Sequence, residues 1–165
     1  MRDRRVVILA PDKTRRCGVD RILPGLLPCV SESTIVAGTG APYDINLIQS
    51  HKTLAHVCEG VRDGGTIVLA AECPEGAGHP DFVQHGSARE MARALRADYR
   101  VYRQTAWALR AKAERWRIVR VTRCEPPPGI RRVGSLEEAA LLTRGRGAIV
   151  PNGPATWVTR TRRPP

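Results

Sequence analysis

Aromatic residues, long apolar runs and paired cysteines are scarce in this 165-residue chain, and each shortage excludes a class of protein. No apolar run approaches the ~20 residues that a membrane-spanning helix needs. The charged N-terminal residues lead directly into a short strand-like run, without the apolar stretch and cleavage site of a signal peptide. We therefore expect a cytoplasmic protein that makes no use of a membrane. Thirteen Pro and fifteen Gly residues favour a fold with many turns over a helical bundle.

The cysteines do not have the spacing of a metal site. The sequence contains neither a CxxC nor a CxxH pair, and the number of cysteines is odd. In a chain without a secretion signal this pattern is typical of reduced, partly buried thiols, and it argues against a zinc site. The five positions are Cys17, Cys29, Cys58, Cys73 and Cys124.

The net charge of +11 would suit a nucleic-acid partner, but the composition does not favour one. Only three of the 27 basic residues are lysine, a skew that a GC-rich coding sequence produces by itself. The arginines are spread along the chain, with the densest groups at 2–5, at 89–123 and in the C-terminal tail. Aromatic residues, which stack on bases, make up 4% of the chain. We therefore interpret the charge as compositional and do not expect nucleic acid as a partner.

Short apolar runs alternate with helical segments in the first half of the chain. The runs at Arg5–Ala10, Ser33–Ala37 and Thr66–Ala71 are typical of buried parallel strands. Between the last two, Asp44 is expected to cap a helix that continues to Val61, and Gly64–Gly65 are expected to end that unit. This order predicts an α/β fold, with a small parallel sheet flanked by helices on both faces.

The second half predicts a long helix, a strand and a short capped helix. Residues 87–117 are rich in Ala, Arg and Leu, which favour helix, and Ile118–Thr122 favours a strand. Ser135 is a good cap for a short helix that has acidic residues in its first turn, and Ala148–Val150 is the last expected strand. We expect a single α/β domain over residues 1–158 and a disordered basic tail over residues 159–165.

Ligands of open parallel sheets bind beyond the carboxyl ends of the strands, and three segments of this chain occupy that position. They are residues 12–16, 38–44 and 72–78, which follow the first, second and third expected strands. We expect these segments to line one crevice.

A polar stripe runs along the helix that follows the second strand. Gln49, Lys52 and His56 are spaced three and four residues apart, so they share one helix face. Lysine is a compact charge that suits a small anion, and Arg15 in the first turn can hold a carboxylate through two hydrogen bonds. Arg15 and Lys52 together would bind a small carboxylic acid. The alternative is a solvated helix face and an unrelated surface turn.

Three stretches of the sequence carry extended motifs. In VVILAPDKTRRCGVDRILPGLL, a strand precedes an Asp-x-Thr-Arg turn and an Ile-Leu-Pro segment. The stretch APYDINLIQSHKTLAHVCEGVRDGGTIVLAAECPEGAG contains Asp-Ile-Asn-x-x-Gln-x-x-Lys, Gly-Gly-Thr-Ile and Glu-Cys-x-Glu-Gly. The third, AIVPNGPAT, contains Ile-x-Pro-x-Gly-Pro. Together these motifs resemble the lactate racemase family, and the second, from its C-terminal domain, is long enough to be specific.

The resemblance implies a lactate racemase C-terminal-domain-like fold and a defined chemistry. The family uses a nickel-pincer nucleotide, which takes a hydride from a 2-hydroxy acid and returns it to either face of the transient 2-keto acid. By resemblance, Arg15 and Lys52 hold the substrate carboxylate, Gln49 lines the site, and Asp12 lies on the cofactor side. The implied partner is a small 2-hydroxy or 2-keto acid.

The catalytic middle of the family is missing from this chain. Only 28 residues separate Arg15 from Asp44, where the family has a long segment with the nickel and proton-transfer histidines and the lysine that reacts with the pincer. In addition, Ile48 stands where the family usually has tyrosine. Because no histidine of this chain matches a family motif, we assign no catalytic residue and no metal ligand. The four histidines are His51, His56, His79 and His85.

These observations leave three hypotheses. The first is a shortened lactate racemase-like isomerase, or part of one, related to racemisation or epimerisation of 2-hydroxy acids, whose site needs the nickel-pincer nucleotide. An alternative is a subunit of a split enzyme, with a second chain carrying the missing segment as its partner. The second is a non-catalytic remnant that binds a carboxylate, and the missing histidines favour it for this chain alone. The third is a basic nucleic-acid-binding protein.

Overall fold

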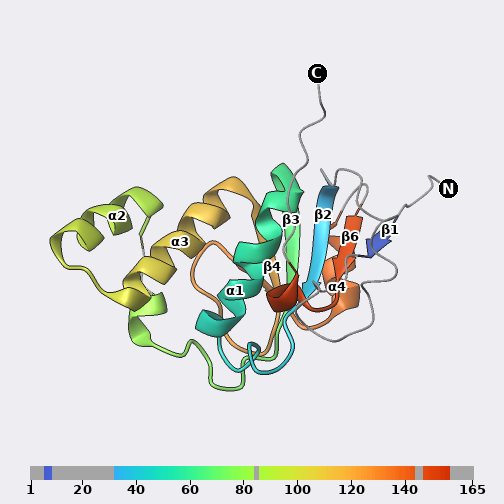
Figure 1. Ribbon diagram of the computed structural model, residues 1–165, viewed down its shortest axis with the longest axis horizontal. Coiled ribbons are helices and arrows are strands. Elements are labelled where there is room, and N and C mark those ends of the chain that lie inside the picture. The colour runs from blue at the N-terminus through green and yellow to red at the C-terminus, as the bar shows by residue number, and fades with distance from the viewer. Residues whose placement is uncertain (1–5, 9–31, 84–85, 144–146, 157–165) are drawn as a thin grey trace.

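The computed structural model describes residues 6–8, 32–83, 86–143 and 147–156. Helices and strands alternate along these ranges, with short 3₁₀ helices at three places (Figure 1). The strands are β1 (Val6–Ile8), β2 (Glu32–Gly38), β3 (Val61–Ala70), β4 (Arg117–Val121), β5 (Arg131–Val133) and β6 (Gly147–Val150). The helices are α1 (Leu47–Val57), η3 (Cys58–Gly60), η4 (Pro80–Val83), α2 (Ala88–Ala97), α3 (Val101–Arg115), α4 (Leu136–Leu141) and η5 (Gly153–Ala155).

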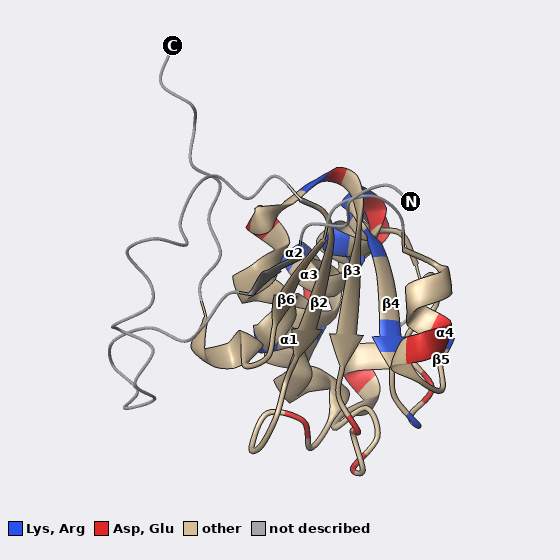
Figure 2. Cartoon of the chain, turned by 90° about the vertical axis from the view of Figure 1, so that its right-hand side faces the viewer, with Lys and Arg blue, Asp and Glu red and all other residues tan. Residues whose placement is uncertain are grey.

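The six strands of the described ranges form one sheet in the order β1-β6-β2-β3-β4-β5. Every pairing between neighbours is parallel, so all carboxyl ends lie at the same edge of the sheet. From β2 to β5 the chain adds strands in one direction, and β6 then returns to the other side of β2 (Figure 2). The order of the strands therefore reverses between β6 and β2, and ligands of such sheets bind at such a reversal.

Each face of the sheet has its own hydrophobic core. Alternate residues of the strands, such as Ile35, Ile67 and Ile118, pack against α1 and α3 in the larger core. The residues between them, such as Val68 and Val119, pack against α4 in a smaller one. Helices thus cover both faces, and the predicted α/β fold with a parallel sheet is confirmed. In the described part of the chain no helix combines the length and the apolar character needed to cross a bilayer.

Two boundaries around β3 differ from the expectation. The helix after β2 ends at Val57 and is followed by η3, so Val61 begins a strand. The two glycines lie within β3, where the register with β2 shifts, and Gly64 has a φ of +71°. A side chain at Gly65 would approach the carbonyl oxygen of Ser33 to 2.9 Å. These glycines therefore form a bulge that lengthens the strand, which a sequence reading mistakes for a helix end.

The predicted helix over residues 87–117 is interrupted. Asp98 ends α2 and Arg100 precedes α3, and both have extended backbones, so the segment forms two helices that pack against each other. Ser87 caps α2 in a reciprocal arrangement with Glu90. The cap predicted at Ser135 is present, since its side chain accepts a hydrogen bond from the Glu138 amide. The short strand β5 was not predicted.

Candidate functional site

The loops after β2 and β3 are joined at the carboxyl edge of the sheet by backbone hydrogen bonds. These loops carry the two most specific motifs, Asp-Ile-Asn and Glu-Cys-x-Glu-Gly. The three bonds run from Cys73 N to Asp44 O (2.8 Å), from Glu75 N to Ile45 O (2.9 Å) and from Leu47 N to Gly76 O (3.0 Å). The backbone groups of both motifs therefore hold the two loops together.

Asn46 is the centre of this junction and the cap of α1, a role that the sequence analysis gave to Asp44. Its side-chain oxygen accepts a hydrogen bond from the Gln49 amide at 2.9 Å, and its side-chain nitrogen donates to Glu75 at 3.4 Å. Gly78 lies so close that a Cβ there would come within 2.8 Å of the Asn46 side chain. Asn46 thus fixes where α1 begins, and with it the direction in which Gln49 and Lys52 project.

The predicted polar stripe is present on α1, whose opposite side is buried through Leu47 and Leu54. Gln49 is half-buried and Lys52 is exposed. The Lys52 ammonium lies 5.0 Å from the ring centre of Tyr43, and it forms no ion pair with a described residue. A cation held against an aromatic ring but without a counter-charge is available to a small anion.

The third matched motif packs against the same helix. His56 Nδ1 lies 3.3 Å from the carbonyl oxygen of Gly153 in η5. A Cβ at Gly153 would overlap the Thr53 side chain, and a Cβ at Gly38 would come within 2.6 Å of the Pro151 carbonyl oxygen. The Pro-x-Gly-Pro loop after β6 therefore needs glycine to approach α1. This contact places it beside the stripe, at the strand-order reversal.

A cavity of about 370 Å³ opens at the carboxyl ends of β3 and β4. Asp44 and Glu72 both line it, which supports the expectation that the loops after β2 and β3 share one crevice. Thr122 and Arg123, which follow β4, also line it and were not predicted as site residues. Arg123 directly follows the expected strand over Ile118–Thr122, and this position is the signal that could have found it. Gln49 and Lys52 do not line this cavity.

Arg120 is a further polar residue that the sequence analysis missed. It points from β4 into the larger core, is fully buried, and donates one hydrogen bond to Ser50 Oγ at 2.8 Å. Its other polar nitrogens, Nε and Nη2, have no partner among the described residues. Burial lowers the pKa of Arg120 to about 10. The strand pattern could have revealed it, because Ile118 and Arg120 must face the same side of the sheet.

Comparison with known proteins shows which protein family has this sequence and fold. Residues 28–121, from before β2 to the end of β4, match the lactate racemase C-terminal domain family. The chain belongs to this family. The structure is also similar to that of the lactate racemase apoprotein from Thermoanaerobacterium thermosaccharolyticum, with a TM-score of 0.69 and 21% sequence identity over 82% of this chain. A comparison with curated protein sequences gave no match.

The chain spans 36% of the length of that lactate racemase. The family match includes the interlocked loops and α1 with Gln49 and Lys52, so the predicted C-terminal-domain-like fold is confirmed. Arg15 and Asp12, the two other residues that the resemblance assigned to the site, lie outside the described residues. The pairing of Arg15 with Lys52 therefore stays a prediction.

The histidines of the described ranges do not form the donor set of a nickel-pincer nucleotide. His51 is buried against Phe82, with ring centres 6.5 Å apart. Burial, followed by the charges of Lys112 and Arg120, lowers its pKa to about 3 and keeps it neutral. His79 stacks on Tyr102, with ring centres 4.2 Å apart. Among the described residues no group of three or more His, Cys, Asp or Glu side chains is placed to hold a metal ion.

Proposed function

We propose that this chain is the substrate-binding part of a lactate racemase-like isomerase, and that it holds a small 2-hydroxy or 2-keto acid through Lys52 and Gln49. The observation that carries the proposal is the exposed Lys52 ammonium. It projects from the helix of the family motif and has no counter-ion among the described residues. A carboxylate at Lys52 and a hydroxyl or carbonyl group at Gln49 would match the two side chains in charge and hydrogen bonding.

Affinity for such an acid should be low when the chain is alone. A charge-assisted hydrogen bond contributes roughly 1.5–3 kcal/mol, and ordering Lys52 and the ligand offsets part of it. Two such contacts correspond to binding in about the millimolar range. If Arg15 joins Lys52, as the resemblance implies, it would provide the second charged contact.

Titration with lactate and pyruvate, followed by NMR, tests the binding site. Lys52→Met removes the charge and keeps the apolar stem, so we expect binding to weaken at least about fivefold. Arg62→Met is the matched control, because Arg62 is also exposed and unpaired among the described residues but lies on β3, outside the stripe. Equal affinity in the Lys52 variant, or equal loss in the control, would show that the acid binds elsewhere.

Catalysis is proposed to need a second chain with the missing histidine segment and the nickel-pincer nucleotide. The reason is that the described histidines are buried, hydrogen-bonded to backbone or stacked, and do not converge. Co-expression with an adjacent reading frame encoding such a segment, together with the cofactor-synthesis enzymes, should give lactate racemisation measurable by chiral chromatography. Lys52→Met should lower the rate without preventing the two chains from co-purifying.

The same observation favours a second candidate, a carboxylate-binding protein without catalysis. Both candidates predict that Lys52 binds the acid, so the titration does not separate them. The co-expression experiment does. A second chain that associates with this one but gives no racemisation, in the presence of the loaded cofactor, would select the non-catalytic binding protein.

A further inference from the structure

Among the described residues, the positive charge is concentrated in one structural unit. Residues 86–117, which form α2, α3 and the start of β4, contain nine Lys or Arg and three Asp or Glu residues. Residues 32–83 contain two Lys or Arg and seven Asp or Glu residues. A coding bias towards arginine would raise its frequency in both segments. The difference indicates that the basic charge of the helical pair α2–α3 has a local cause.

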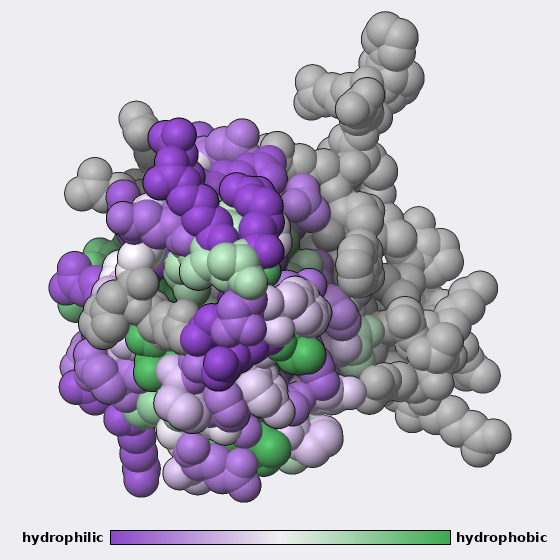
Figure 3. Space-filling model, turned by 90° about the vertical axis from the view of Figure 1, so that its left-hand side faces the viewer, coloured by the Kyte–Doolittle hydropathy of each residue, from purple (hydrophilic) through white to green (hydrophobic). Residues whose placement is uncertain are grey.

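Helix α2 presents a row of arginines to solvent. Arg89, Arg93 and Arg96 are spaced four and three residues apart, so they lie on one side of the helix, and all three are exposed. None forms an ion pair with a described residue. The buried residue of the helix, Met91, packs into the main core. Helix α2 lies at the end of the molecule farthest from β1 (Figure 1), and this end is largely hydrophilic, with separate apolar residues (Figure 3).

Two tyrosine rings are exposed where α2 turns into α3. Tyr99 is 65% exposed and Tyr102 is 41% exposed. Each ring has a side-chain partner, because the Tyr99 hydroxyl donates to Gln104 at 3.0 Å and Tyr102 stacks on His79 with ring centres 4.2 Å apart. An aromatic ring that is exposed and already fixed in place loses little entropy when a base stacks on it.

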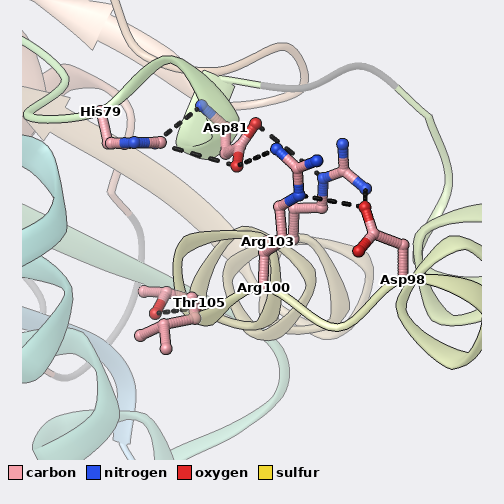
Figure 4. Close-up of polar contacts among 7 residues, drawn as sticks. His79, Asp81, Asp98, Arg100, Arg103 and Thr105 are labelled. Atoms are coloured by element: carbon pink, nitrogen blue, oxygen red, sulfur yellow. Dashed lines mark hydrogen bonds and ion pairs between the residues drawn. The ribbon is translucent and has the colours of Figure 1, made fainter.

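Ion pairs fix the backbone that carries these rings (Figure 4). Asp98 accepts from Arg100 at 3.0 Å and from Arg103 at 2.9 Å. Asp81 in η4 lies 3.9 Å from both guanidinium groups. The two aspartates lie on opposite sides of the arginines, which ties the turn to the body of the protein. Arg100 is still 54% exposed, so it adds to the positive charge beside Tyr99.

We propose that the α2–α3 pair binds single-stranded nucleic acid, with the arginine row on the phosphates and the tyrosines on the bases. Exposed rings next to unpaired guanidinium groups match the two chemical parts of such a strand. A membrane surface fits less well, because Met91 of α2 is buried in the core, and Val101, the exposed aliphatic residue of the pair, is too small an apolar surface to anchor the helices in a bilayer. An acidic protein would use the arginines but gives no role to the fixed rings.

Fluorescence anisotropy with a labelled single-stranded oligothymidine, measured over a series of salt concentrations, tests this proposal. The logarithm of the binding constant falls linearly with the logarithm of the salt concentration, and each phosphate contact on a single strand contributes roughly 0.7 to the slope of that line. The variant R89Q/R93Q/R96Q should therefore reduce the magnitude of the slope by about two. At roughly 0.1 M salt the corresponding loss of affinity is about 100-fold. The matched control R62Q/R131Q/R132Q removes the same charge from exposed positions outside the pair and should change binding much less.

A second variant separates stacking from charge. Tyr99→Leu removes the ring and keeps an apolar side chain, so binding of the single strand should weaken about fivefold or more with an unchanged salt slope. Binding to a duplex of the same length should stay as it was, because its bases are already stacked. Equal losses in the two triple variants, tighter binding to anionic vesicles or poly-glutamate than to the oligonucleotide, or no effect of Tyr99→Leu would overturn the proposal.

Discussion

At the scale of single residues, Arg120 is the least expected feature of the core. It is fully buried, it donates a hydrogen bond to the uncharged Ser50 hydroxyl, and its other polar neighbours are the Cys73 and Cys124 thiols. A buried guanidinium without a carboxylate loses hydration that one neutral bond does not restore. The lowered pKa of Arg120, which is due first to desolvation, has the same cause.

Replacing Arg120 by methionine should therefore not destabilise the protein. We expect Arg120→Met to raise the free energy of unfolding by about 1–3 kcal/mol, since Ser50 Oγ keeps its bond to the Leu47 carbonyl. Urea denaturation at neutral pH measures it, with the exposed Arg131→Met as a control that should change stability by less than about 0.5 kcal/mol. A loss of more than about 2 kcal/mol in Arg120→Met would show that the guanidinium has a strong partner.

His51 gives the protein a specific sensitivity to acid. Its pKa is about 3 in the folded protein and about 6.5 when it is exposed, so between these values the unfolded chain binds a proton that the folded chain does not. Stability must then fall as the pH falls from about 6.5 towards 3, by roughly 3 kcal/mol at pH 4.5 for this group.

The His51→Gln variant removes this proton from both states. We expect the difference in unfolding free energy between pH 7 and pH 4.5 to be smaller in the variant than in the unmodified protein by roughly 3 kcal/mol. The comparison uses the change with pH, so a uniform cost of the substitution cancels. Parallel pH profiles for the two proteins would mean that His51 is accessible to protons in the folded state.

At the scale of elements, the junction of the loops after β2 and β3 determines where α1 begins. Gly76 and Gly78 both have left-handed backbones, with φ values of +67° and +83°, but only Gly78 is also crowded by Asn46. Alanine costs about 1–2 kcal/mol in a left-handed conformation, and overpacking adds a further 1–3 kcal/mol or so.

These two glycines form a matched pair for mutation. We expect Gly78→Ala to destabilise the protein by about 2–4 kcal/mol and Gly76→Ala by about 1–2 kcal/mol, measured by chemical denaturation. The excess in Gly78→Ala is the cost of displacing the Asn46 cap. If the two variants lose equal stability, the contact between Gly78 and Asn46 does not hold the junction together.

The sequence predicts the elements well where local patterns decide them. The apolar runs that became β2 and β4, and the cap at Ser135, are all readable from neighbouring residues. The motif around Gln49 and Lys52 also predicted the helix and its polar stripe. What was missed depends on distant partners. Asn46 caps α1 because Glu75 and Gly78 hold it, and the glycine bulge in β3 exists because β2 pairs with it.

The residues of the candidate site also fall into those that local sequence predicts and those that depend on distant partners. Lys52 is found from its helix spacing and from the family motif, both of which are local. Arg123 follows an expected strand in the sequence, but only the pairing of β4 with β3 brings it to the cavity that the residues after β3 also line. The alternation within β4 already places Arg120 on the same face as Ile118, but its partner Ser50 is found only when α1 packs on that face.

At the scale of the whole molecule, the protein combines an acidic sheet edge with a basic helical pair. The loops after β2 and β3 carry Asp44, Glu72 and Glu75, and Figure 2 shows acidic residues at the arrowhead ends of the strands. The basic unit is α2–α3, described above. A second chain that completes the substrate site would approach the edge with Lys52, whereas the proposed nucleic-acid surface lies at the end of the molecule that carries α2. The two proposals can therefore be tested independently.

The nickel content of the purified protein tests whether this chain needs a second chain to form a metal site. A bound metal needs several deprotonated donors in one place, and the described histidines do not converge. After expression with the cofactor-synthesis enzymes, we expect the purified chain alone to hold far less than one nickel per chain by elemental analysis. The complex with a second chain carrying the missing histidines should hold about one. The chain expressed without those enzymes provides the background. One nickel per chain in the protein alone would show that this chain contains a complete metal site, and the proposed division of labour between two chains would be wrong.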